Sequence, residues 1–125
     1  MTTKKRISRT LLMVLVLSLL LTTAALAATN DPFSFSFNYK GEICSDTANK
    51  SNTKSYATVT VSSKTSGLTA LAWIQNSNGI RETTEQTFSA TTQYTMYYSP
   101  NWTDGYKTLK ASGSIVGGMS GVWTP

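Results

Sequence analysis

The chain has 125 residues, of which 40% are hydrophobic and 14% are charged, and it contains one cysteine and no histidine. The lack of histidine removes the commonest general base, the commonest zinc ligand and every Ser-His or Cys-His nucleophile pair. One cysteine excludes an internal disulfide framework, so any domain of this chain depends on its hydrophobic core.

The first 27 residues have the pattern of a secretory signal peptide. Four basic residues and no acid precede an apolar run over residues 11–21, and small residues then precede a cut between Ala27 and Ala28. An uncleaved membrane anchor is the alternative, although the strictly apolar run is shorter than the ~20 residues that a bilayer needs. We expect a Sec-exported, extracellular protein that meets the membrane only during export, with a single secreted domain over residues 28–125.

Most of the excess basic charge lies in this leader. The formal net charge of the whole chain is +5, but the leader holds four of the 11 basic residues and none of the six acidic ones. The rest of the chain carries a net charge of about +1, which is too small for the electrostatic footprint of nucleic-acid binding. We therefore expect no nucleic-acid partner.

Residues 33–39 alternate strictly between aromatic and small polar side chains. This period of two predicts a half-buried strand that carries Phe33, Phe35, Phe37 and Tyr39 on its inner face. The burial of three phenylalanine rings is worth on the order of 5 to 9 kcal/mol before chain entropy is counted. We expect this strand to anchor one sheet.

The next segment is polar and lacks a clear period. Residues 45–54 are interpreted as a loop, either disordered or exposed for recognition. Just before them, Cys44 either pairs with another chain or is a free or buried thiol. The second alternative is favoured, because a lone cysteine commonly packs as a small hydrophobic residue.

The most apolar stretch after the leader is Leu68–Gln75, which follows a second alternating segment over residues 55–63. Its length of about eight residues favours a strand buried on both faces over a short helix. Asn78-Gly79 can then take the positive φ angles of a tight hairpin turn, and residues 80–83 form the returning edge arm. Trp73, within this stretch, is expected to pack in the core.

Two further alternating segments cover residues 93–99 and 106–111, with a turn between them, and a glycine-rich tail follows. Six to eight short strands with turn signals every 8 to 12 residues are typical of an all-β fold. We predict a small antiparallel β-sandwich or a partly open barrel. Serine and threonine on its outer faces protect sheet edges poorly, so self-association is a further expectation.

The acidic residues offer no catalytic pattern. Glu82 and Glu85 would point to opposite faces of a strand, and we expect both to be solvated instead of forming a carboxylate pair across a cleft. A calcium loop through Asp46 and Asn49 lacks the necessary density of acids. We expect no enzyme activity, no catalytic residue, no metal and no cofactor.

Aromatic side chains are the remaining candidates for a binding site, since their rings stack on sugars and bury well against other proteins. Trp102 lies in a polar turn beside Asp104 and is the best candidate for an exposed aromatic ring. Tyr97 and Tyr106 are the other two candidates. The expected partner is an unidentified extracellular protein or a cell-wall glycan.

The segments 33–37 and 111–125, together with Trp73, resemble a group of uncharacterised small secreted proteins of Gram-positive bacteria. That resemblance implies secretion and a β-sandwich, and it brings no catalytic residues.

Residues 55–61, 70–74 and 90–98 are similar to the lactococcin-type secreted bacteriocins, which interfere with cell-wall synthesis in neighbouring cells. This chain differs from those bacteriocins in its phenylalanine-rich segment and its glycine-rich tail, and in lacking histidine. The expectation is a non-enzymatic, bacteriocin-like competition factor; the alternative is a cell-surface or matrix-associated module that binds glycan or protein.

Overall fold

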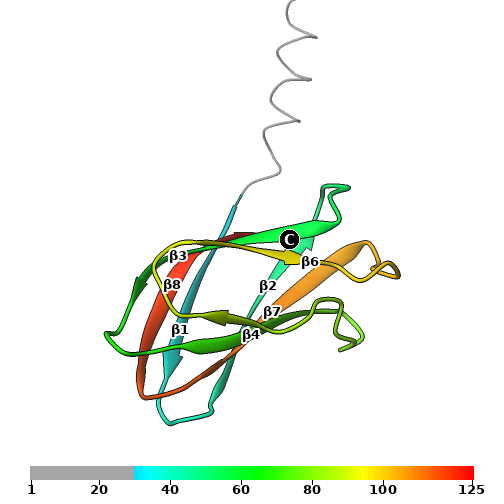
Figure 1. Cartoon of the computed structure of the whole chain (residues 1–125). Coiled ribbons are helices and arrows are strands. Elements are labelled where there is room, and N and C mark those ends of the chain that lie inside the picture. The colour runs from blue at the N-terminus through cyan, green and yellow to red at the C-terminus, as the bar shows by residue number, and fades with distance from the viewer. Residues whose placement is uncertain (1–29) are drawn as a thin grey trace, which may run out of the picture.

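The computed structural model describes residues 30–125, so the expected signal peptide and its cleavage site at Ala27 and Ala28 lie outside the described residues. Eight antiparallel strands form two four-stranded sheets that pack against each other (Figure 1). The strands are β1 (Asp31–Phe37), β2 (Ile43–Lys50), β3 (Tyr56–Lys64), β4 (Ala70–Asn76), β5 (Gln86–Phe88), β6 (Gln93–Tyr97), β7 (Gly105–Gly113) and β8 (Gly117–Thr124). The predicted all-β fold is confirmed. Of the two expected architectures, the structure shows the sandwich.

The last strand lies in the middle of its sheet. Sheet A has the order β1-β8-β3-β6 and sheet B the order β2-β7-β4-β5. Along β8, Gly121 pairs with Phe33 on one side and with Val61 on the other, and a bulge follows between Val61 and Ser63 of β3. The glycine-rich tail is therefore a central strand that joins the first strand of the domain to its middle.

The core lies between the inner faces of the two sheets. Phe33, Phe35 and Phe37 are each at most 3% exposed, as the alternation of their segment predicts. The prediction for Tyr39 is wrong. β1 ends at Phe37, and Tyr39 is exposed in a turn where Gly41 has a φ of 86° and reverses the chain.

The central hairpin is confirmed. β4 ends at Asn76, Gly79 has a φ of 79°, and the N–H of Asn76 donates to the carbonyl of Ile80 at 2.9 Å. Trp73 is buried, but it lies outside the core cluster, and the Arg81 guanidinium sits 4.2 Å from the centroid of its ring. Trp73 is therefore buried as expected, but it lies on the outer face of sheet B beneath Arg81 and not in the core cluster between the sheets.

The interpretation of residues 45–54 as a loop is wrong for most of its length. Residues 43–50 form β2, an edge strand of sheet B that pairs with β7. Two charged residues of β2 point inward, where Asp46 accepts from the Trp123 indole N–H at 2.7 Å and Lys50 donates to the Pro125 carbonyl at 3.3 Å. Because these partners are more than 70 residues away in the chain, no local pattern reveals the strand.

Cys44 of β2 is a free, half-buried thiol. Its Sγ donates to the carbonyl of Ser36 at 3.3 Å, which links the edge strands of the two sheets. Burial raises the pKa of this thiol, so it is protonated at neutral pH.

The carboxyl of Asp46 makes the stability of the fold depend on pH. Burial, followed by a hydrogen bond with Asp31, raises the pKa of Asp46 to about 6. Since the folded pKa lies above the unfolded value, stability falls as the pH rises from about 4 to about 6 and stays low above that. Asp46→Asn removes this pH-dependent loss of stability, and the amide oxygen of asparagine can still accept from the Trp123 indole N–H.

We expect Asp46→Asn to raise the free energy of unfolding by about 1 to 2 kcal/mol near pH 7.5, after discounting for partial exposure. Near pH 3.5 the gain should be small, because Asp46 is then mostly protonated in both states. Urea unfolding at both pH values tests this, with the exposed Asp104→Asn as control. An equal effect of Asp46→Asn at both pH values would contradict it.

Candidate functional site

The outer face of sheet A is polar and almost uncharged. Its cross-strand neighbours are Ser34 with Ser120, Ser120 with Ser63, Thr58 with Thr124 and Thr95, and Thr60 with Val122 and Gln93. Asp31 is the one acidic residue in the four strands of this sheet, and it hydrogen-bonds with Asp46 of sheet B. The outer face therefore presents hydroxyls and amides, with Lys54 and Lys64 at opposite ends of β3.

One end of this face is hollowed by a depression of about 380 Å³. It is lined by three amides, two threonine hydroxyls, one lysine and one aromatic ring. These residues are Asn30, Asn52, Gln93, Thr58, Thr124, Lys54 and Tyr56, and we call the depression the Tyr56 hollow.

Several side chains of the Tyr56 hollow are held in place by neighbours. The Asn52 amide donates to the Pro125 carbonyl at 2.8 Å, and its oxygen accepts from the backbone N–H of Lys54 at 3.0 Å. Tyr56 pairs with Tyr97 of β6, and their ring centroids lie 6.2 Å apart with an interplanar angle of 60°. The hollow thus combines the Tyr56 ring, which Tyr97 flanks, with positioned amide groups.

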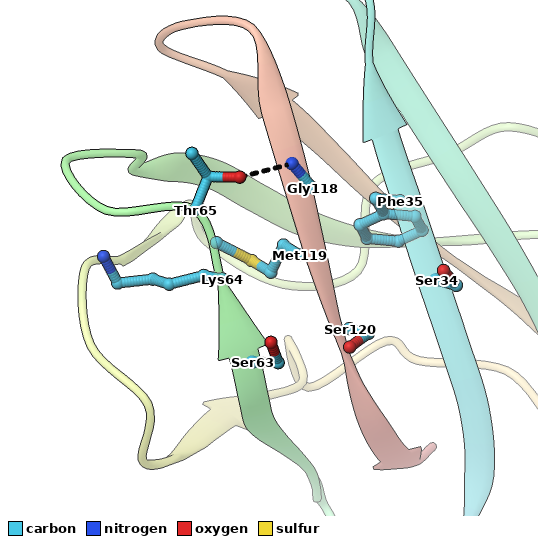
Figure 2. A pocket seen from close by; sticks show the side chains of 8 residues that line it. All are labelled: Ser34, Phe35, Ser63, Lys64, Thr65, Gly118, Met119 and Ser120. Carbon is cyan, nitrogen blue, oxygen red and sulfur yellow. Dashed lines mark hydrogen bonds between the residues drawn. The ribbon is translucent and has the colours of Figure 1, made fainter.

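A second depression, of about 330 Å³, opens on sheet A at the other end of β3 (Figure 2). Ser34, Ser120 and Ser63 line it from three neighbouring strands, and we call it the serine hollow. Thr65 closes one side, where its hydroxyl accepts from the Gly118 N–H at 2.9 Å (Figure 2). The outer face of sheet A therefore carries a polar hollow near each end of β3.

The structure does not bring the three predicted aromatics together. Tyr97 lies beside Tyr56 and is 69% exposed, whereas Tyr106 is 62% exposed on the outer face of sheet B. Trp102 is half-buried, with its ring 5.8 Å from that of Tyr98 and the Lys50 ammonium 4.8 Å from its centroid. Tyr56 was not singled out, and the pairing of β3 with β6 is what places it beside Tyr97.

A buried polar cluster lies where the β4 hairpin meets β7. Glu82 is 3% exposed and forms an ion pair with the fully buried Lys107, so the expectation of a solvated Glu82 is wrong. Burial opposes ionisation of Glu82, but hydrogen bonds from Lys107 and Thr103 outweigh it and lower its pKa. Glu85 is solvated as expected and pairs with Arg81 at 2.7 Å.

The hydroxyl of Tyr98 is buried near this cluster and has no hydrogen-bond partner among the described residues. Burial, followed by the charge of Glu82, raises the pKa of Tyr98. The Lys50 ammonium lies 4.6 Å from the centroid of the Tyr98 ring, on which a cation is favoured.

The proposed calcium donors are separated, since Asp46 faces inward and Asn49 faces outward on β2. Within residues 30–125, no group of three or more histidine, cysteine, aspartate or glutamate side chains is placed to hold a metal ion. Over the same range, no helix has the length and apolar character that crossing a membrane would require.

Fold and surface together define a small β-sandwich with a hollowed polar face on sheet A. No family model, no curated protein and no solved structure matches the chain.

Proposed function

We propose that this chain is an exported, non-enzymatic protein that binds a cell-wall polysaccharide through the outer face of sheet A. The observation that carries the proposal is the Tyr56 hollow, where an aromatic ring stands beside three amides and two hydroxyls. A sugar presents an apolar C–H face that packs on an aromatic ring, and hydroxyls that exchange hydrogen bonds with amides.

The dimensions of the face favour a polymer over a single sugar. The two hollows lie near opposite ends of β3, and Tyr56 and Lys64 are separated by eight residues of extended strand, or about 26 Å. A linear glycan of several rings could follow β3 from one hollow to the other. The strand ladders hold this surface rigid, which lowers the entropic cost of binding.

The charges of the face favour a neutral or anionic polysaccharide. The four strands of sheet A place no carboxylate on the face, while Lys54 lines the Tyr56 hollow and Lys64 lines the serine hollow. A polymer with anionic groups would therefore meet the Lys54 ammonium at the Tyr56 hollow and no repulsion along the face. Growth inhibition is supported only by the sequence resemblance to bacteriocins. The proposal is therefore limited to binding.

Removal of the aromatic pair should weaken binding. We expect Tyr56→Ala combined with Tyr97→Ala to reduce retention on purified cell-wall polysaccharide at least about tenfold, which corresponds to about 1.4 kcal/mol. Affinity electrophoresis in gels that contain the polysaccharide measures this change.

The matched control is Tyr106→Ala, which removes a ring of the same type and of similar exposure from the outer face of sheet B. It should leave retention unchanged. Equal retention of the double variant and the wild type, or an equal loss in the control, would contradict the proposal. The circular dichroism of each variant verifies that the sandwich is intact.

A further inference from the structure

Three buried side chains with complementary chemistry meet where β4 and β7 pair. Asn76 of β4 lies directly opposite Lys107 of β7, and the two residues are 7% and 0% exposed. One carboxylate contacts both, since Lys107 Nζ donates to Glu82 Oε1 and Asn76 Nδ2 donates to Glu82 Oε2 at 3.3 Å. An amine, an amide and an acid are therefore enclosed together away from water.

The amide of Asn76 is polarised from its other side. Its Oδ1 accepts the backbone N–H of Asn78 at 3.0 Å and that of Ile80 at 3.1 Å. Two backbone donors on one carbonyl oxygen withdraw electron density from the carbon, and they stabilise the negative charge that forms when a nucleophile adds to it. The hairpin turn thus supplies the features of an oxyanion hole at Asn76.

We propose that Lys107 Nζ and the side-chain carbon Cγ of Asn76 join in an intramolecular isopeptide bond, with Glu82 as the proton carrier. Glu82 first takes a proton from the Lys107 ammonium, and the neutral amine then attacks Cγ. The negative charge moves to Oδ1, where the N–H groups of Asn78 and Ile80 hold it. Glu82 passes its proton to Nδ2, and the Cγ–Nδ2 bond breaks to release ammonia. The ammonia takes the extra proton from Nζ and leaves as ammonium, so that Nζ keeps one hydrogen in the new secondary amide.

The reaction balances without another reactant. The lysine ammonium and the primary amide become a secondary amide and an ammonium ion, no group is oxidised or reduced, and Glu82 ends as the carboxylate it was at the start. Residues opposite each other in an antiparallel pair have Cβ atoms about 5 Å apart, which gives the two groups a high effective concentration.

The reaction requires Lys107 Nζ to move toward Asn76. Lys107 Nζ also donates to the carbonyl and hydroxyl of Thr103, a residue of the exposed loop between β6 and β7. Rotation within the flexible lysine side chain moves Nζ from Thr103 toward Asn76, while Glu82 contacts both groups. Lys110 of the same strand points outward and lacks this acid.

Intact-mass spectrometry of the purified full-length product tests the proposal. Peptide mapping of the same sample identifies the N-terminus from which the mass is calculated. We expect the measured mass to be lower than this calculated mass by one ammonia, about 17 Da. Proteolysis should yield a branched peptide that joins residues from β4 and β7. A linear chain of full calculated mass would overturn the proposal, and so would a loss of about 18 Da, which indicates a Lys107–Glu82 amide.

Variants assign the roles of the three residues. Lys107→Met and Glu82→Gln should each restore the full mass, whereas Lys110→Met should keep the loss of ammonia. If a variant does not fold, wild-type chain that is recovered unfolded from inclusion bodies and kept in denaturant, before the bond has formed, replaces it in the test. Its mass should fall after dilution into buffer and not before, and a mass that never falls would overturn the proposal.

Discussion

Gly121→Ala is expected to unfold the protein under conditions in which the wild type is folded. A Cβ at this position would lie 1.8 Å from the carbonyl oxygen of Thr60 and 3.1 Å from the ring of Phe33. The Thr60 carbonyl is backbone in the strand next to β8, so it cannot move away without disrupting the ladder at the centre of sheet A. We expect a cost above about 3 kcal/mol, which is a large part of the stability of a small domain.

Gly118→Ala is the matched control for this prediction. It lies on the same strand, and its added Cβ would meet the Phe35 carbonyl at 3.6 Å, an ordinary contact distance. Urea unfolding followed by circular dichroism should show a large loss for Gly121→Ala and little change for Gly118→Ala. Similar midpoints for the two variants would show that β8 can shift away from β3.

Trp123→Ala is expected to have the next largest effect. Trp123 is 1% exposed, and its indole N–H donates to Asp46 of the opposite sheet at 2.7 Å. Truncation of a buried tryptophan to alanine typically costs about 3 to 5 kcal/mol, because it removes apolar contacts and leaves a cavity. It also leaves the half-buried Asp46 carboxyl without its indole donor.

Trp123→Phe keeps a six-membered ring in the core but removes the N–H group together with the five-membered ring of the indole. We therefore expect an intermediate loss of about 1 to 3 kcal/mol. Trp102→Ala, at a half-buried position outside the strands, should cost less than Trp123→Ala. Thermal unfolding monitored by circular dichroism compares the three variants. A loss for Trp102→Ala as large as that for Trp123→Ala would show that the two rings contribute equally to the core.

The proposed isopeptide bond would give this chain the kind of cross-link that disulfides give to other small domains. A domain of under one hundred residues has a modest core, and exported domains of this size often gain stability from cross-links that constrain the unfolded chain. This chain has a single cysteine and no partner for it within the sequence. A bond between Asn76 and Lys107 would tie the central hairpin to β7 in the way that a disulfide does elsewhere.

The binding surface could be predicted only in part. Tyr97 was identified as a candidate from its aromatic side chain, but its partner Tyr56 precedes it by 41 residues, and the register of β3 against β6 brings the two rings together. Trp102 stood in a turn of polar residues, and Lys50 of a distant strand covers its ring. A turn sequence reports local conformation and contains no information about which side chain from another strand will cover it.

The class of fold could be predicted from the sequence, because the signals for strands and turns are local. Alternation with a period of two placed Phe33, Phe35 and Phe37 inside, and Asn78-Gly79 predicted the hairpin turn. The partners of the buried charges could not be predicted, because they depend on long-range packing. The charged residues of β2 are typical of a loop in the sequence, but in the structure Asp46 and Lys50 point inward and bond to Trp123 and Pro125. Glu82 was expected to be solvated, but it forms a buried ion pair with Lys107. A buried charge is tolerated only where a partner satisfies it, and here most of those partners come from distant parts of the chain.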